Sequence, residues 1–156
     1  MFPCIAWERF SDEMYLKVKK RWQKIIVGGL GIILIGVTVF VAINRTDWIT
    51  AVHNLFYYVF IIAFAEEFVF RDVSTYLLKD ERTAVRYLVP NLVFAACHVF
   101  NYSGYGILTA TYILHFIRYD LVVLLIVGCF FQWLKEKSGT LWIPVLIHAI
   151  WNIILP

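Results

Sequence analysis

Side chains that can perform acid–base chemistry occur inside segments of this chain that are otherwise strongly apolar. Carboxylates, imidazoles and guanidinium groups are costly at membrane depth, and by default they mark a functional site. Three short patterns contain them: AEEFVFR with Glu66, Glu67 and Arg71, FAACH with Phe94 and His98, and HAIWN with His148 and Asn152. We therefore predict that the three patterns form one site.

The first two patterns have the spacing of helix faces, on which residues four apart are neighbours. Glu67 and Arg71 can then form an ion pair along one helix, while Glu66 points about 100° away and is free to face another group. Phe94 lies one turn before His98 and can shield its imidazole from solvent. The spacing favours a carboxylate and an imidazole that both face a common interior.

In the third pattern, His148 and Asn152 share a helix face and can both donate hydrogen bonds to one oxygen. The three patterns are also expected at the same depth in the membrane. Glu66 lies 16 residues before Arg82 and His98 lies 16 after it. Two antiparallel helices that leave a turn at Arg82 would place both at one level. Asn152 follows the last predicted turn by about 18 Å of helix. We expect all four groups at comparable depth, nearer the cytoplasmic half of the bilayer.

This set is sufficient for peptide hydrolysis. Glu66 and His98 can hold one water, with the carboxylate as general base. His148 and Asn152 would donate to the developing oxyanion, with about 3–4 kcal/mol from each good donor. We expect no covalent nucleophile in these patterns. Zinc bound by Glu66, His98 and His148 is the alternative. We favour metal-free chemistry, because HExxH is absent and Asn is a poor zinc ligand.

Membrane spans are the elements that must position these groups. Of the 156 residues, 62% are hydrophobic and 16% are charged, against about half and about a quarter in a soluble domain. A domain of ~150 residues leaves roughly a third of its chain surface in solvent, so this excess must face lipid. Aromatic residues at 18% suit a chain that crosses both membrane interfaces. We predict an all-α, polytopic transmembrane helical bundle.

Apolar runs predict about five spans. They are residues 25–43, 48–78, 85–102, 105–134 and 141–156, with short polar connections at 44–47, 79–83, 101–106 and 135–140. The first run is close to the ~20 residues that cross a bilayer, and no small-residue cleavage site follows it, so we expect a retained anchor. Arg118 and Asp120 could mark a break or a pore-facing pair in the fourth run. His53 and His115 have no companions at helical spacing, so we expect structural or interfacial roles.

Basic residues predict the orientation. They gather on one set of connections, namely Lys17, Lys19, Lys20, Arg21 and Lys24, then Lys79, Arg82 and Arg86, then Lys135 and Lys137, whereas the other set has only Arg45. The positive-inside rule therefore predicts a cytoplasmic N-terminus. The domain organisation would be a basic cytoplasmic segment at 1–24 and a bundle at 25–156, with a peptidase core at about 48–152. Basic residues beside a span are ordinary topology signals, so we expect no nucleic-acid partner.

In order and spacing, EExxxR, FxxxH and HxxxN resemble the three motifs of the CAAX-protease and bacteriocin-processing (CPBP, or Abi) family, which has an Rce1-like eukaryotic branch. The likeness covers about residues 48–152. It implies a glutamic intramembrane endopeptidase. Glu66 and His98 would hold the catalytic water, His148 and Asn152 would form the oxyanion hole, and Glu67 and Arg71 would order the site.

The resemblance also implies a biological setting. Small Gram-positive relatives are associated with bacteriocin self-immunity and peptide processing, so we expect a multi-pass protein of a bacterial plasma membrane. Its partners would be a peptide or membrane-protein substrate and membrane lipids, and prenyl substrates are not implied. Family members commonly have more helices before the core, whereas only one precedes Glu66 here. A minimal enzyme, a homo-oligomer and dependence on a partner subunit therefore stay open.

Three other functions are compatible with the same residues. A non-catalytic immunity or scaffold protein could keep the fold and block a toxin by binding. A proton relay could use Glu66, Glu67 and His98, although the motifs show no repeat and five spans suit inverted symmetry poorly. A haem could bind between His98 and His148. Cys4, Cys97 and Cys129 lack CxxC spacing, and we expect free thiols.

Overall fold

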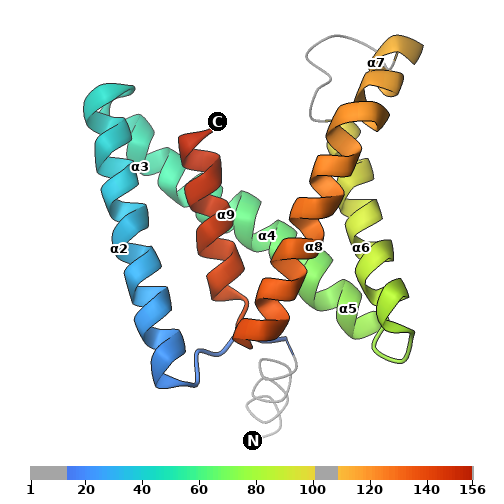
Figure 1. Cartoon of the computed structure of the whole chain (residues 1–156). Coiled ribbons are helices and arrows are strands. Elements are labelled where there is room, and N and C mark those ends of the chain that lie inside the picture. Colours follow the sequence, from blue (N-terminus) through green and yellow to red (C-terminus); the bar gives the residue numbers. More distant parts are fainter. Residues whose placement is uncertain (1–13, 101–108, 156) are drawn as a thin grey trace, which may run out of the picture.

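A computed structural model describes residues 14–100 and 109–155, and all regular elements in these ranges are helical (Figure 1). In chain order the elements are α2 (Arg21–Asn44), α3 (Trp48–Phe56), η1 (Tyr57–Ala63), α4 (Phe64–Glu67), η2 (Phe68–Val73), α5 (Ser74–Leu77), α6 (Thr83–Cys97), η3 (His98–Phe100), α7 (Ala110–His115), η5 (Phe116–Asp120), α8 (Leu121–Ser138) and α9 (Trp142–Ile154). Several of these elements join end to end into longer helices.

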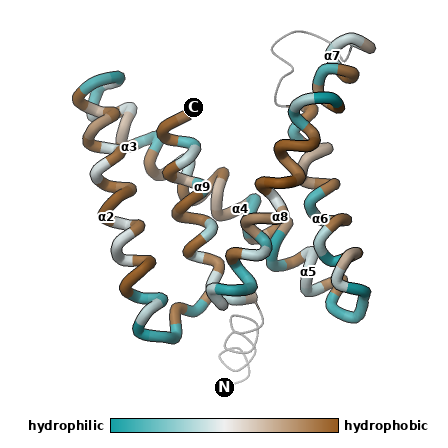
Figure 2. Tube along the Cα trace, in the orientation of Figure 1, coloured by the Kyte–Doolittle hydropathy of each residue, from teal (hydrophilic) through white to brown (hydrophobic). Residues whose placement is uncertain are grey.

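Within the described residues, four helices are long and apolar enough to cross a bilayer: Arg21–Asn44, Trp48–Leu77, Thr83–Phe100 and Ala110–Ser138. They correspond to the first four predicted spans, so the all-α membrane fold is confirmed. The successive helices run alternately between two ends of the molecule (Figure 1). Hydrophobic residues dominate their middle portions, and the connection between α5 and α6 is hydrophilic (Figure 2).

The fifth apolar run forms a shorter helix than expected. Helix α9 has 13 residues, about 20 Å of helix, against a hydrocarbon core about 30 Å thick. It packs against α2 and the second span, and Val145 and Ala149 are fully buried. Other elements hold both of its ends: Trp142 Nε1 donates to the Leu16 carbonyl over 2.9 Å, and Arg45 donates to the Ile154 carbonyl over 3.0 Å. Because these contacts fix α9 inside the bundle, its length is not set by the bilayer.

The second span changes its helical pitch around the first pattern. Its π-helical segments η1 and η2 lie on either side of the short α4, which contains Glu66 and Glu67. A π-turn holds an extra residue and rotates the following side chains, and such turns are frequent at functional sites. This wider winding sets the directions of the two adjacent carboxylates.

The fourth span is continuous through Arg118 and Asp120, so they do not mark a break. The π-helical η5 covers this stretch and brings residues five apart onto one face. His115 Nδ1 therefore lies 3.6 Å from Asp120 Oδ2, a companion that α-helical spacing did not predict. The His115 side chain is 65% exposed. His53 stacks on Tyr57 with ring centroids 6.0 Å apart.

The connection predicted at 135–140 is shorter in the structure. Helix α8 continues to Ser138 and ends at Gly139, whose φ of +66° is the left-handed cap that glycine adopts without strain. Lys135 thus belongs to the last helical turn, where its side chain is 2% exposed. Gln23 ties the start of α2 to this turn by donating to the Ser138 carbonyl over 2.7 Å. Lys135 is therefore a buried cation of the bundle and not a residue of a connecting loop.

Candidate active site

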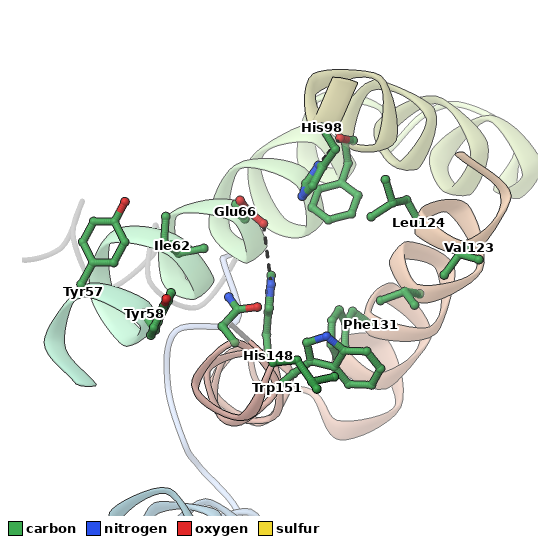
Figure 3. Close-up of a pocket in the computed structure, with 14 residues that line it drawn as sticks. Tyr57, Tyr58, Ile62, Glu66, His98, Val123, Leu124, Phe131, His148 and Trp151 are labelled. Carbon is green, nitrogen blue, oxygen red and sulfur yellow. Dashed lines mark hydrogen bonds and ion pairs between the residues drawn. The ribbon is translucent and has the colours of Figure 1, made fainter. Parts of the chain in front are cut away.

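A cavity of about 620 Å³ lies between the second span, α6, α8 and α9. All four residues predicted to perform chemistry line it: Glu66 from α4, His98 from the end of α6, and His148 and Asn152 from α9. In Figure 3 the Glu66 carboxylate lies between the two imidazoles, with His98 on one side and His148 on the other. The predicted meeting of three distant sequence patterns in one place is therefore present in the structure.

Glu67 is fully buried and holds His148, which lines this cavity. Its Oε1 lies 3.0 Å from His148 Nδ1, and its Oε2 lies 3.4 Å from Arg71 Nε. Because a carboxylate can only accept, Nδ1 of His148 is the donor in this bond. The Glu67 carboxylate thereby fixes both the rotation and the tautomer of the imidazole.

The other nitrogen of His148 faces the second carboxylate. Nε2 lies 3.8 Å from Glu66 Oε2, the pair joined by the dashed line in Figure 3. The ring also stacks on Phe131, with centroids 5.3 Å apart and an interplanar angle of 21°. Two adjacent glutamates therefore contact opposite nitrogens of one ring, and Glu66 keeps its access to the cavity.

His98 is fixed in a similar way by its own helix. Its Nδ1 is 2.8 Å from the Phe94 carbonyl, an acceptor, so Nδ1 is the donor, and in the neutral ring Nε2 has a lone pair. The two rings also pack with centroids 4.4 Å apart. Helix α6 tightens into the 3₁₀ turn η3 at this residue. An unprotonated Nε2 is suited to accept a hydrogen bond from a bound water.

Arg71 has contacts beyond the ion pair with Glu67 that its spacing predicted. Its side chain is fully buried, and its guanidinium carbon lies 4.2 Å from the centroid of the Phe94 ring. Such a cation–π contact contributes about 2 kcal/mol or more when it is desolvated. Phe94 therefore contacts both Arg71 and His98. Phe94 was predicted to shield His98, and its ring also packs against the guanidinium of Arg71.

Sequence reasoning missed a polar group on the far side of Arg71. Asn91 Nδ2 donates to the Tyr87 carbonyl over 2.7 Å and lies 3.4 Å from Gln132 Oε1. At Gly128 an added Cβ would meet Asn91 Oδ1 at 2.4 Å and an Arg71 nitrogen at 3.3 Å. Asn91 and Gln132 are amides inside apolar runs, a signal that could have identified them. Gly128 gives no comparable signal in the sequence.

A buried ion pair supports the backbone of Arg71. Lys135 Nζ lies 3.1 Å from Asp72 Oδ1 and donates to the Arg71 carbonyl over 2.6 Å. Thr75 donates to the same carbonyl and lies 3.1 Å from Lys135 Nζ. These residues tie α8 to the second span one helical turn beyond Glu67. Lys135 escaped prediction because a lysine near a predicted turn normally faces water.

Glu66, His98 and His148 were considered as ligands of an alternative zinc site. Within residues 14–100 and 109–155, no three His, Cys, Asp or Glu side chains are grouped closely enough to hold a metal ion. One nitrogen of His148 is engaged by Glu67, and one nitrogen of His98 is engaged by the Phe94 carbonyl. The same side chains fit a hydrogen-bonding site for a water and a carbonyl oxygen.

Comparison with known proteins identifies one family. A family model described as type II CAAX prenyl endopeptidase Rce1-like matches residues 47–154, more than two thirds of the chain and all three motifs. Neither a curated protein nor a solved structure was found to match. The matched segment begins at the start of the second span and includes every residue that lines the cavity except Leu155.

Proposed function

We propose a catalytic mechanism for this chain from the premise that it belongs to the type II CAAX prenyl endopeptidase Rce1-like family. The family and the membrane-spanning helices make the chain an intramembrane endopeptidase in general terms. We assign the chemistry to a water held between Glu66 and His98. The observation that best supports this assignment is the cavity that Glu66, His98, His148 and Asn152 share.

In the first step Glu66 would act as the general base. A water that donates one hydrogen bond to the carboxylate and the other to Nε2 of His98 would direct its oxygen lone pair toward the substrate carbonyl carbon. The water oxygen bonds to that carbon as its proton passes to Glu66. The proton that Glu66 receives is then available for the nitrogen of the departing amine when the C–N bond breaks.

His148 and Asn152 would stabilise the oxyanion that forms in this step. Both are on one face of α9, one turn apart. With Nδ1 of His148 donating to Glu67, Nε2 would donate to the oxyanion from the doubly protonated ring. Arg71 and Glu67 act indirectly, as positioning residues for the imidazole.

The cavity walls favour a substrate segment with apolar side chains. Tyr57 and Ile62 line one part of the cavity, and Val123, Leu124 and Trp151 line another. In Figure 3 these apolar and aromatic groups surround the polar centre formed by Glu66 and His148. An extended stretch of a membrane-associated peptide would expose its carbonyl to this centre. A regular helix would not, because its carbonyls are engaged in internal hydrogen bonds.

We place the protein in a bacterial plasma membrane with its N-terminus in the cytoplasm. The start of α2 and the ends of α5 and α8 lie at one side of the molecule, where the basic cluster and the Lys79–Arg86 segment occur (Figure 1). The end of α2, which Arg45 follows, lies at the other side. The positive-inside rule then assigns the sides. Bacteriocin self-immunity or peptide processing is the role that we propose in this setting.

The direct experiment compares purified wild-type protein and Glu66→Gln in detergent on a quenched peptide library, with and without a chelator. We expect cleavage by the wild type in both conditions and a loss of at least a hundredfold in Glu66→Gln. The matched control is Glu81→Gln, because Glu81 is exposed on the connection between α5 and α6 and outside the cavity. It should keep wild-type activity.

Two other results would reject this mechanism. Loss of cleavage in chelator would indicate a zinc-dependent form of the same protease. Cleavage that is absent from wild type, or equal in wild type and Glu66→Gln, would favour a non-catalytic immunity or scaffold protein that acts by binding. The lack of a visible absorbance band after purification would exclude a bis-histidine haem.

A further inference from the structure

A second cavity of about 500 Å³ lies at the end of the second span, where Asp72, Thr75 and Tyr76 line it. Its volume is within the range of about 300–1,000 Å³ of small-ligand sites. The cavity lies beside the α5–α6 connection and the last turns of α8, and it shares no lining residue with the first cavity. Its charged lining residues are Lys79, Arg86, Lys135, Asp72 and Glu136.

Both acidic side chains of this cavity have a partner within the protein. Asp72 pairs with Lys135 over 3.1 Å, and Glu136 accepts a hydrogen bond of 2.6 Å from the Tyr87 hydroxyl. Three cations and two carboxylates leave one net positive charge in the lining. The acids are thus largely compensated, and an excess of cationic donors remains.

Arg86 supplies the clearest unmet donor. Its Nε is buried and has no hydrogen-bond partner among the described residues. Buried polar atoms are nearly always hydrogen-bonded, so an orphaned donor in a cavity wall calls for a ligand acceptor or water. The guanidinium is planar and forked, a shape that matches the paired oxygens of a phosphate or carboxylate group.

Lys79 adds a second cation on the facing connection. Its Nζ lies 4.7 Å from the centroid of the Tyr76 ring, which holds the ammonium beside the cavity. Lys79 follows the second span, and Arg86 is in the first turn of α6. Both residues therefore lie at span ends, the depth at which lipid phosphates meet a membrane protein.

We propose that this second cavity binds a phosphate-bearing anion, either the headgroup of an anionic phospholipid or a free phosphate, with Arg86 and Lys79 as its ligands. Carboxylate ligands are less suited, because headgroup phosphates are concentrated at this depth. The bound group would lie beside Lys135, which also donates to the Arg71 carbonyl. This inference does not depend on the proposed peptidase chemistry, because the site and its test involve binding alone.

The test measures the thermal unfolding midpoint of the full-length protein in mixed micelles by Trp fluorescence. Wild type, Arg86→Gln and the control Lys137→Gln are compared with phosphatidylglycerol, with phosphatidylcholine, and with inorganic phosphate against chloride at equal ionic strength. Lys137 is exposed at the same end of the bundle and does not line the cavity. We expect phosphatidylglycerol to raise the wild-type and Lys137→Gln midpoints by several degrees, and Arg86→Gln to lose at least half of that shift.

The arms of this experiment separate the sources and the outcomes. A shift with the anionic lipid alone identifies a headgroup, and an equal shift with inorganic phosphate identifies a soluble phosphate. The proposed site would be refuted if both lipids shifted the unfolding midpoint equally. It would also be refuted if Arg86→Gln and Lys137→Gln lost equal parts of the phosphatidylglycerol-induced shift. If Arg86→Gln does not fold, Lys79→Gln replaces it, since Lys79 is exposed. Native mass spectrometry should then show one fewer retained phosphatidylglycerol than in wild type.

Discussion

Replacing Glu67 with Gln tests whether the buried pair of this glutamate and Arg71 positions the site. Both side chains are 0% exposed, with Nε and Oε2 3.4 Å apart. Removal of one partner from a buried ion pair costs about 3–5 kcal/mol, because the remaining charge is uncompensated, whereas replacement of both partners is often nearly neutral. The Phe94 ring keeps part of its attraction for Arg71, so we expect Glu67→Gln to lose about 3 kcal/mol of unfolding free energy.

A double-mutant cycle measures this coupling. Unfolding of wild type, Glu67→Gln, Arg71→Met and the double variant would be followed by Trp fluorescence during denaturant titration in mixed micelles. We expect the double variant to recover at least about 2 kcal/mol relative to the sum of the single losses, at the upper end for residues in contact. Glu81→Gln is the control, since an exposed substitution usually stays within about 0.5 kcal/mol.

Activity separates positioning from stability in the same set of variants. The double variant should remain folded and yet be poorly active, because a neutral amide replaces the carboxylate charge that lies 3.0 Å from His148 Nδ1. A misdirected oxyanion donor lowers kcat by roughly 10²–10³-fold. Coupling near zero would refute the buried pair. A stable double variant with wild-type kcat would refute the need for the Glu67 charge in holding the imidazole.

Three further changes follow from the same contacts. Asn152→Leu should lower kcat by roughly 10²–10³-fold with little change in KM, and an unchanged kcat in steady-state assays would remove Asn152 from the oxyanion hole. Gly128→Ala should cost about 1–3 kcal/mol by overpacking, since its Cβ would lie 2.4 Å from Asn91 Oδ1; an unaltered thermal midpoint would contradict this packing. Lys135→Met should cost about 3–5 kcal/mol of unfolding free energy in denaturant titrations, because Asp72 is left unpaired. Adding Asp72→Asn should restore most of that loss, and a double variant without recovery would contradict a buried pair.

The sequence predicts the spans and the meeting of the site residues well, because both depend on simple distances along helices. An uncharged run of about 20 residues has few alternatives to a span. The equal separation of Glu66 and His98 from Arg82 places them at one level whatever the details of packing. Both line the same cavity in the structure. The spans and the common level of these two residues were therefore predictable, because regular helical geometry fixes them over a long segment.

The sequence does not predict the features that depend on packing between spans. The π-helical turns around Glu66 and at Arg118 change the face on which side chains lie, and no residue type specifies them. Lys135 was counted with the charges of a connection, yet it is buried against Asp72 on another helix. A count of charges registers residue type without burial, so such a partner cannot be inferred from position alone.

The difference between the two adjacent glutamates shows how the fold gives one residue type two tasks. Glu66 and Glu67 are neighbours on α4 and point in different directions, so one reaches the cavity and the other the buried Arg71. His148 joins them, because its Nδ1 contacts Glu67 and its Nε2 faces Glu66. A carboxylate held by a buried arginine can fix a ring, whereas one at a cavity wall can contact a bound water. Substitution of Glu66 should therefore remove activity without loss of stability, while substitution of Glu67 should reduce both.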